Sequence, residues 1–291
     1  MLELDTARNR QLGIAMVSVT TLCFAALDST AKWLVLVLPV FQVVWLRFVT
    51  HTLLAVVTLT PRYGWSLYRP RLVRLQLLRG LMQAVMTALN FWALQYLQLD
   101  VTGAIQFSVP ILIAVISARL LDERLDARRW AAILIGFAGV LLIVRPWSQG
   151  FHPAIVLSLI NAVLYALFNM LTRRMAATEL PATTQLWSAG SAALLLTPLG
   201  LWQWTPPQDT VTWILVLIMG VFGGLGHLMV TQAHRYASAA VLGPFLYQQI
   251  IYMTLFGWLI FGDVPDATVI GGAAVVVASG LYLLYREFRR R

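Results

Sequence analysis

Ionisable side chains inside long apolar stretches are the first candidates for chemistry in this chain. A charged residue at the centre of a bilayer costs about 2.5–3.5 kcal/mol on insertion scales, so it needs a function or a partner. The first apolar stretch holds Asp28 and, one helical turn later, Lys32; the second holds Arg47 and His51 in the same relation. Two interpretations stay open. Asp28, Lys32 and Arg47 form a structural ion pair or gate, or they contact a substrate carboxylate or amine or carry a proton.

Polar side chains also recur at helical spacing inside three other apolar stretches. Residues three, four or seven positions apart share one face of a helix. The three sets are Gln83, Thr87 and Asn90; Ser158, Asn161, Tyr165 and Asn169; and His227, Thr231 and His234. Such faces would be costly against lipid, so we expect them to face protein or water. Hydrogen bonding between helices is the alternative to a solute pathway.

We predict that these faces line a central cavity. Aromatic residues with a polar atom suit an apolar cavity wall that also offers a hydrogen bond, which adds Trp187 and Tyr252. The predicted substrate-binding residues are Arg47, Gln83, Thr87, Asn90, Asn161, Tyr165, Asn169, Trp187, His227 and Tyr252. His227 is also a candidate for proton coupling, because the ordinary pKa of histidine lies near neutrality.

The sequence does not indicate a metal site, a cofactor site or an enzymatic site. The 4 histidines have no cysteine or carboxylate at metal-ligand spacing, and the single cysteine, Cys23, lies in an apolar stretch. Residues 220–226 contain several glycines but follow no strand, so we do not interpret them as a phosphate loop. We expect no metal, no cofactor and no enzyme activity.

The amino-acid composition indicates which class of protein holds these residues. Of 291 residues, 59% are hydrophobic and 11% charged, against roughly 45–50% and 25% in soluble domains. This excludes an ordinary soluble domain and indicates an all-α integral membrane protein. The net charge of +9 does not indicate nucleic-acid binding, because the arginines are spread between apolar stretches. The expected partners are the lipid bilayer and a small-molecule substrate, and a monomer suffices.

Ten apolar stretches are long enough to span a bilayer. They are 12–34, 39–60, 75–96, 101–121, 127–145, 152–172, 183–204, 211–235, 239–261 and 267–285. With the N-terminus in the cytoplasm, all 21 Lys and Arg residues except Lys32, Arg145 and the intramembrane Arg47 fall on the inner side. This bias is typical of inner loops. We therefore expect a multi-pass protein of the cytoplasmic (inner) membrane with both termini in the cytoplasm.

The chain repeats itself with a shift of about 140 residues. The shift places spans three to five on spans eight to ten and the acidic turn at Glu123 on that at Asp263. We predict two repeats, residues 1–147 and 148–291, with five helices each. Because five is odd, the second repeat enters the membrane from the opposite side. Inverted repeats of this kind are typical of secondary transporters.

Several motifs carry a resemblance to a known family. They are Pro39, Arg47, Pro110, the run 121–125, Trp130, Gly136, Gly139 and Val140 in the first half, and 261–263, 271–272 and 279–281 in the second. On these residues the chain resembles the drug/metabolite transporter superfamily in its ten-helix form with two EamA repeats. It departs from the pattern at Asp263, where glutamate is usual, and at Ile250, which stands in the place of Pro110.

The resemblance implies a secondary transporter that moves a small organic solute by alternating access. The branch it is most similar to implies amino acids or related metabolites as substrates, with export the expected direction. A channel, a membrane scaffold, or a transporter of drugs or other metabolites with the same fold are the alternatives.

Overall fold

The protein is described by a computed structural model over residues 7–120, 127–145, 151–175, 178–236, 242 and 245–288. Within these ranges the regular structure is helical throughout, with no strand. The helices are α1 (Ala7–Leu34), α2 (Val40–Tyr63), the 3₁₀ helix η1 (Gly64–Tyr68), α3 (Val73–Leu94), α4 (Leu99–Gln106), α5 (Val109–Leu120), α6 (Ala127–Val144), α7 (Ile155–Met175), α8 (Pro181–Trp202), α9 (Thr210–Tyr236), α11 (Gln248–Phe261) and α12 (Ala267–Phe288).

The fourth predicted span is not one helix, which corrects the sequence interpretation. It divides into α4 and α5 at a turn that contains Phe107 and Ser108. Pro110 has no backbone N–H to donate to the carbonyl of Gln106, so the hydrogen-bond ladder of a continuous helix cannot pass this point. The continuous apolar composition of 101–121 concealed the break.

A second break lies at the position that the repeat predicts. The 140-residue shift maps Phe107 onto Tyr247, and Tyr247 lies in the turn that precedes α11. The two rings contact each other, with their centroids 5.1 Å apart. The breaks of the two halves therefore meet inside the molecule.

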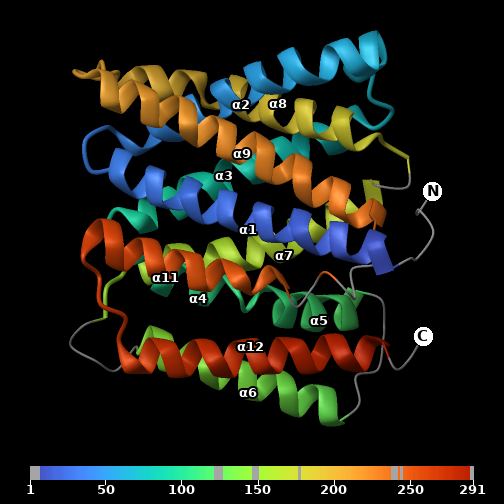
Figure 1. The fold of residues 1–291 in the computed structure, drawn as a ribbon, viewed down its shortest axis with the longest axis vertical. Coiled ribbons are helices and arrows are strands. Elements are labelled where there is room, and N and C mark those ends of the chain that lie inside the picture. The colour runs from blue at the N-terminus through green and yellow to red at the C-terminus, as the bar shows by residue number, and fades with distance from the viewer. Residues whose placement is uncertain are drawn as a thin grey trace.

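The main contacts between helices stay the same when the corresponding helices of the two halves are exchanged. Such an exchange converts α1 to α7, α2 to α8, α3 to α9 and α6 to α12. The contact of α1 with α9 then becomes that of α7 with α3, and both are formed. The contact of α2 with α9 becomes that of α8 with α3, and both are again formed, while α2 with α8 and α6 with α12 map onto themselves. Figure 1 shows α6 and α12 together at one end of the stack of helices.

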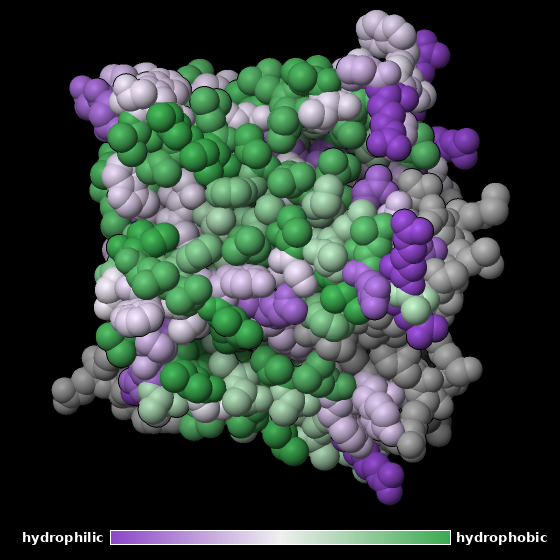
Figure 2. Space-filling view, viewed as in Figure 1, coloured by the Kyte–Doolittle hydropathy of each residue, from purple (hydrophilic) through white to green (hydrophobic). Residues whose placement is uncertain are grey.

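The molecule exposes large apolar side chains and buries several charged ones in its interior, unlike a soluble protein. Large apolar side chains such as Val57, Leu134 and Leu194 are exposed, at 70%, 65% and 76%, whereas Arg47 and His51 are buried. Figure 2 shows hydrophobic residues across the middle of the visible face. A surface of this kind matches lipid and would be an aggregation hazard in water.

Several helices are long and apolar enough to cross a membrane by length and composition. They are 7–34, 40–68, 73–94, 155–172 and 210–230, and shorter apolar helices lie at 99–113, 130–144, 248–261 and 267–283. The helix axes lie side by side along a common orientation (Figure 1). We call the face near the two marked chain ends the terminal face and the opposite one, with the α1–α2 and α11–α12 turns, the loop face.

The charge bias predicts that the terminal face is cytoplasmic. A reporter fused after Arg291 should be active as a cytoplasmic reporter, and one inserted at Pro206-Pro207, between α8 and α9, should be active only outside. Paired phosphatase and fluorescent-protein fusions measure this. The same side for both insertion points would contradict the ten-span topology, which places an odd number of crossings between Pro206-Pro207 and the C-terminus.

Candidate functional site

Helix α3 carries a continuous line of polar side chains, which we call the α3 stripe: Arg79, Gln83, Thr87 and Asn90. The successive spacings of four, four and three residues keep these side chains on one face. Arg79 and Gln83 are buried, and α3 packs between α7 and α8. The stripe thus runs through the interior of the bundle, as the sequence predicted for Gln83, Thr87 and Asn90.

Two opposite charges meet the loop-face half of the stripe. Asn90 Nδ2 donates to Asp28 Oδ1 at 3.0 Å, and Arg47 Nη1 donates to Thr87 Oγ1 at 3.5 Å. Asp28 and Arg47 attract each other electrostatically. Among the residues described, however, no carboxylate lies within 4.0 Å of the Arg47 guanidinium. The direct Asp28–Arg47 ion pair is therefore not formed, because each side chain is held by its own partner on α3.

Glycines of α9 let Arg47 and His51 lie against that helix. A Cβ placed on Gly223 would lie 3.7 Å from Nε and Nη2 of Arg47. A Cβ on Gly224 would lie 3.3 Å from His51 Cδ2 and 2.8 Å from Leu54 Cδ2. Arg47 Nε is buried and has no hydrogen-bond partner among the described residues. It is available to a ligand that reaches this point.

Two histidines stack beside Arg47. The rings of His51 and His227 are nearly parallel, at 11°, with centroids 5.9 Å apart. Gln185 Nε2 lies 3.2 Å from His51 Nε2 and also donates to the Gly224 carbonyl. His227 thus stacks on His51, and its contact with substrate stays a prediction. The predicted substrate-binding residues did not include His51 or Gln185.

Arg79 begins the stripe nearer the terminal face. Its Nε donates to Thr172 Oγ1 of α7 at 3.0 Å, and its Nη1 donates to Ser188 Oγ of α8. The guanidinium lies 4.3 Å from the centroid of the Phe168 ring and interacts electrostatically with Tyr165. Sequence reasoning placed Arg79 at the inner interface. Its position four residues before Gln83 was the signal that it continues the polar face.

The remaining predicted wall residues are distributed more widely. Asn169 Nδ2 donates to the backbone oxygen of Tyr165. Asn161 Nδ2 donates to Gln106 Oε1 at 3.4 Å, beside the break between α4 and α5. Trp187 is half-buried on α8, and Tyr252 packs against the main apolar cluster of the interior. These four positions stay a prediction as substrate contacts.

Lys32 pairs with a residue of the other half. Lys32 Nζ lies 2.7 Å from Asp263 Oδ2, in the turn between α11 and α12. The ammonium also lies 4.7 Å from the centroid of the Phe261 ring, and Asp100 of α4 interacts electrostatically with both charges. The ion pair between Lys32 and Asp263 thus connects α1 to the second repeat at the loop face. Sequence reasoning grouped Lys32 with Asp28 because only local spacing was visible.

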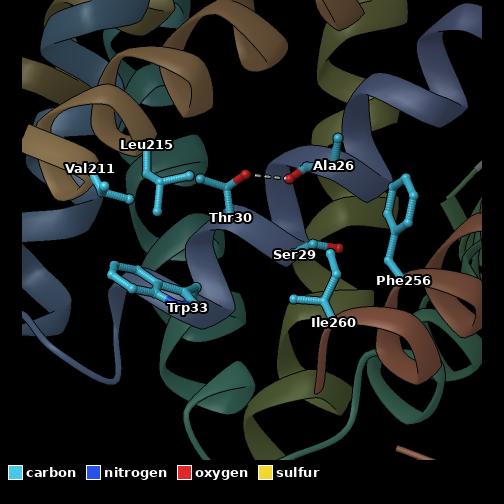
Figure 3. A pocket seen from close by; sticks show the side chains of 8 residues that line it. All are labelled: Ala26, Ser29, Thr30, Trp33, Val211, Leu215, Phe256 and Ile260. Carbon is cyan, nitrogen blue, oxygen red and sulfur yellow. Dashed lines mark hydrogen bonds between the residues drawn. The ribbon is translucent and has the colours of Figure 1, made fainter. Parts of the chain in front are cut away.

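A cavity lined mostly by apolar side chains lies away from these charges. It has a volume of about 330 Å³ between α1, α9 and α11, and Figure 3 shows its largely apolar lining. The hydroxyl of Thr30 donates to the Ala26 carbonyl within α1. A smaller cavity of about 160 Å³ touches Gln185 and Gly224 and so adjoins the histidine pair. The larger cavity offers no charge to a polar solute, and we do not assign it to substrate.

Two related bundles, paired helix breaks and a buried polar stripe are typical of membrane transporters with repeated halves. The comparison with known families identifies the particular transporter family. The model of the EamA-like transporter family matches residues 11–145 and 152–286. The chain therefore belongs to the EamA-like transporter family, of the drug/metabolite superfamily type.

Curated relatives with similar sequences are named as transporters. The chain is 28% identical over 236 residues to the riboflavin transporter of Vibrio cholerae, which covers 79% of this chain and 74% of that one. It is 22% identical to the S-adenosylmethionine uptake transporter of Rickettsia bellii, over 97% of each chain. It is 28% identical to the pseudopaline exporter of Pseudomonas aeruginosa, over 91% of this chain and 94% of that one.

A solved crystal structure of a protein shares the fold. It aligns with a TM-score of 0.64 and 20% sequence identity, over 97% of this chain and 99% of that one. This likeness shows the fold alone. The family match and the names of the relatives support a transporter of small solutes in a membrane.

The separate partners of Asp28 and Arg47 predict weak coupling between them. Asp28→Asn and Arg47→Gln should each alter the stability of the protein, and their effects should add to within about 1 kcal/mol in the double variant. A double-mutant cycle of thermal unfolding in detergent measures this. A double variant that is clearly more stable than either single one would show a direct ion pair.

The pair between Lys32 and Asp263 predicts the opposite behaviour. Lys32→Ala or Asp263→Ala leaves the other charge in a mostly buried position, where the loss is roughly 3 kcal/mol. The exchanged variant with Lys32→Asp and Asp263→Lys should recover more than half of that loss. The melting temperature reports the result, and an exchanged variant no better than the single ones would refute the pairing.

Proposed function

We propose that this protein exports zwitterionic metabolites of the amino-acid type across the cytoplasmic membrane, with both termini in the cytoplasm. The observation that carries the proposal is the arrangement of Asp28 and Arg47. They are opposite charges held close together in the interior by different groups of α3 rather than by each other. An α-amino acid presents the complementary charges on neighbouring atoms.

In this proposal Arg47 receives the carboxylate and Asp28 receives the ammonium group. Guanidinium suits a carboxylate because its donors form a planar fork, and the buried Arg47 Nε has no described protein partner. Charge-assisted hydrogen bonds of this kind contribute about 1.5–3 kcal/mol each. Gln83 and the two histidines supply further polar contacts beside the charges.

The repeats supply the means of alternating access. The two breaks, at Phe107 and Tyr247, are points where each half can bend without losing a long hydrogen-bond ladder. The pair of Lys32 with Asp263 joins the halves at the loop face and serves as the outer closure. Export is proposed from the resemblance to metabolite exporters, and the pseudopaline exporter among the relatives agrees with it.

Three matched mixtures test this proposal on the purified full chain. The first contains the common α-amino acids, the second the corresponding amines without carboxylate, and the third the corresponding acids without ammonium. Because a ligand that binds the folded state raises its apparent stability, the amino acids should raise the melting temperature most. If the acid or the amine mixture raised the melting temperature as much as the amino acids do, recognition of a zwitterion would be contradicted.

Flux measurements separate a transporter from a channel. Proteoliposomes preloaded with an amino acid that stabilises the protein should accumulate labelled amino acid by counterflow. Arg47→Gln should lower this rate about tenfold or more, since a charged hydrogen bond is lost. The exposed Arg74 offers a control, and Arg74→Gln should transport normally. Current that rises linearly with voltage, without counterflow, would identify a channel.

A further inference from the structure

Arg79 is a second buried cation that the zwitterion site does not use. Arg79 is 8% exposed, and its described partners are the hydroxyls of Thr172 and Ser188, the ring of Phe168 and Tyr165. These groups orient a guanidinium but do not neutralise it. A buried charge without a counter-charge is costly, so its retention needs an anion or a role in packing.

The charge balance around the stripe favours an anion. Of the carboxylates that the structure describes, Asp28 alone interacts with either arginine, and it interacts with Arg47. The other described carboxylates are engaged elsewhere. Glu179 accepts from the backbone N–H of Leu72, and Asp263 pairs with Lys32. Asp100 is also buried but accepts from the backbone N–H of Val101. Within the described part of the chain, no carboxylate therefore neutralises Arg79.

The spacing of the two arginines indicates the size of the ligand. Arg47 meets α3 at Thr87, and Arg79 stands eight residues earlier on the same face. At 1.5 Å per residue this is about 12 Å along the helix. Gln83 lies between them with a buried Oε1 that has no described partner. Gln83 thus places a further polar side chain between the two cations.

We infer that Arg79 binds a second anionic group of the substrate, so that the transported class is acidic amino-acid-like solutes. This rests on the proposed function, in which Arg47 and Asp28 hold the α-carboxylate and the ammonium group. Arg79 then receives a carboxylate or phosphate on the side chain of the solute. Thr172 on α7 and Ser188 on α8, both in the second half of the chain, hold Arg79 on α3 of the first, so this contact depends on how the halves are arranged.

The chemistry of the probe tests the inference in the unmodified protein. Each acid is compared with its neutral amide: aspartate with asparagine, glutamate with glutamine, and 2-aminoadipate with its 6-amide; O-phosphoserine is compared with serine. Binding is measured by thermal shift and by competition for counterflow. At least one acid should bind about tenfold or more tightly than its neutral mate, the factor expected for one charged hydrogen bond. A phosphate preference would show as O-phosphoserine exceeding the dicarboxylic acids.

Variants of Arg79 then connect the preference to this residue. Arg79→Gln should bring the ratio of acid to amide affinity close to one while the amide still binds, and Arg74→Gln on the same helix should leave the ratio unchanged. Arg79→Lys keeps the charge without the planar fork and should retain part of the preference, which covers the case in which Arg79→Gln fails to fold.

The outcomes separate this inference from the proposed function. If zwitterions bind but no acid exceeds its neutral mate, Arg79 has a packing role and the inference is wrong. If the preference survives in Arg79→Gln, or in Arg79→Lys at full strength, another residue recognises the second group and the inference is again wrong. If zwitterions bind no better than simple acids or amines, the proposed function itself fails.

Discussion

The structure depends on the cost of placing polar groups in a medium that cannot hydrate them. Polar side chains inside the bundle are stabilised mainly by partners within the protein. Asn90 holds Asp28, Thr87 holds Arg47, and Thr172 and Ser188 hold Arg79. This requirement gathers α1, α2, α7 and α8 around one face of α3. The same partners keep the charges apart, so they stay able to bind an ion of opposite sign.

The relation between the halves turns this arrangement into a pathway. The breaks at Phe107 and Tyr247 meet, and α6 packs on α12 through close contacts at glycines. A Cβ on Gly139 would lie 2.9 Å from the backbone oxygen of Gly272, so little can separate these two helices. They form a closely packed edge of the bundle. The charges of the stripe lie on the other side of the breaks, where α1, α2, α8 and α9 pack.

Hydropathy predicted most helices because burial in lipid requires about 20 apolar residues whatever the details of packing. The α4–α5 break was not predicted, since Pro110 interrupts hydrogen bonding without changing hydropathy. The stripe was predicted by period alone, except for Arg79, whose charge resembled that of an interfacial residue. Contacts between distant segments, such as Lys32 with Asp263, have no local sequence signal. They arise only when the repeats fold together.

Thiol accessibility along α3 tests the central claim most directly. In a Cys23→Ser background, Gln83→Cys and Thr87→Cys lie on the stripe, whereas Leu81→Cys and Val85→Cys lie on exposed apolar positions of the same helix. A membrane-impermeant thiol reagent should modify the two stripe positions during transport, and a transported amino acid should protect them. The two control positions should stay unmodified in lipid. If the reagent modified the two control cysteines but not the two stripe cysteines, a solute pathway along α3 would be contradicted.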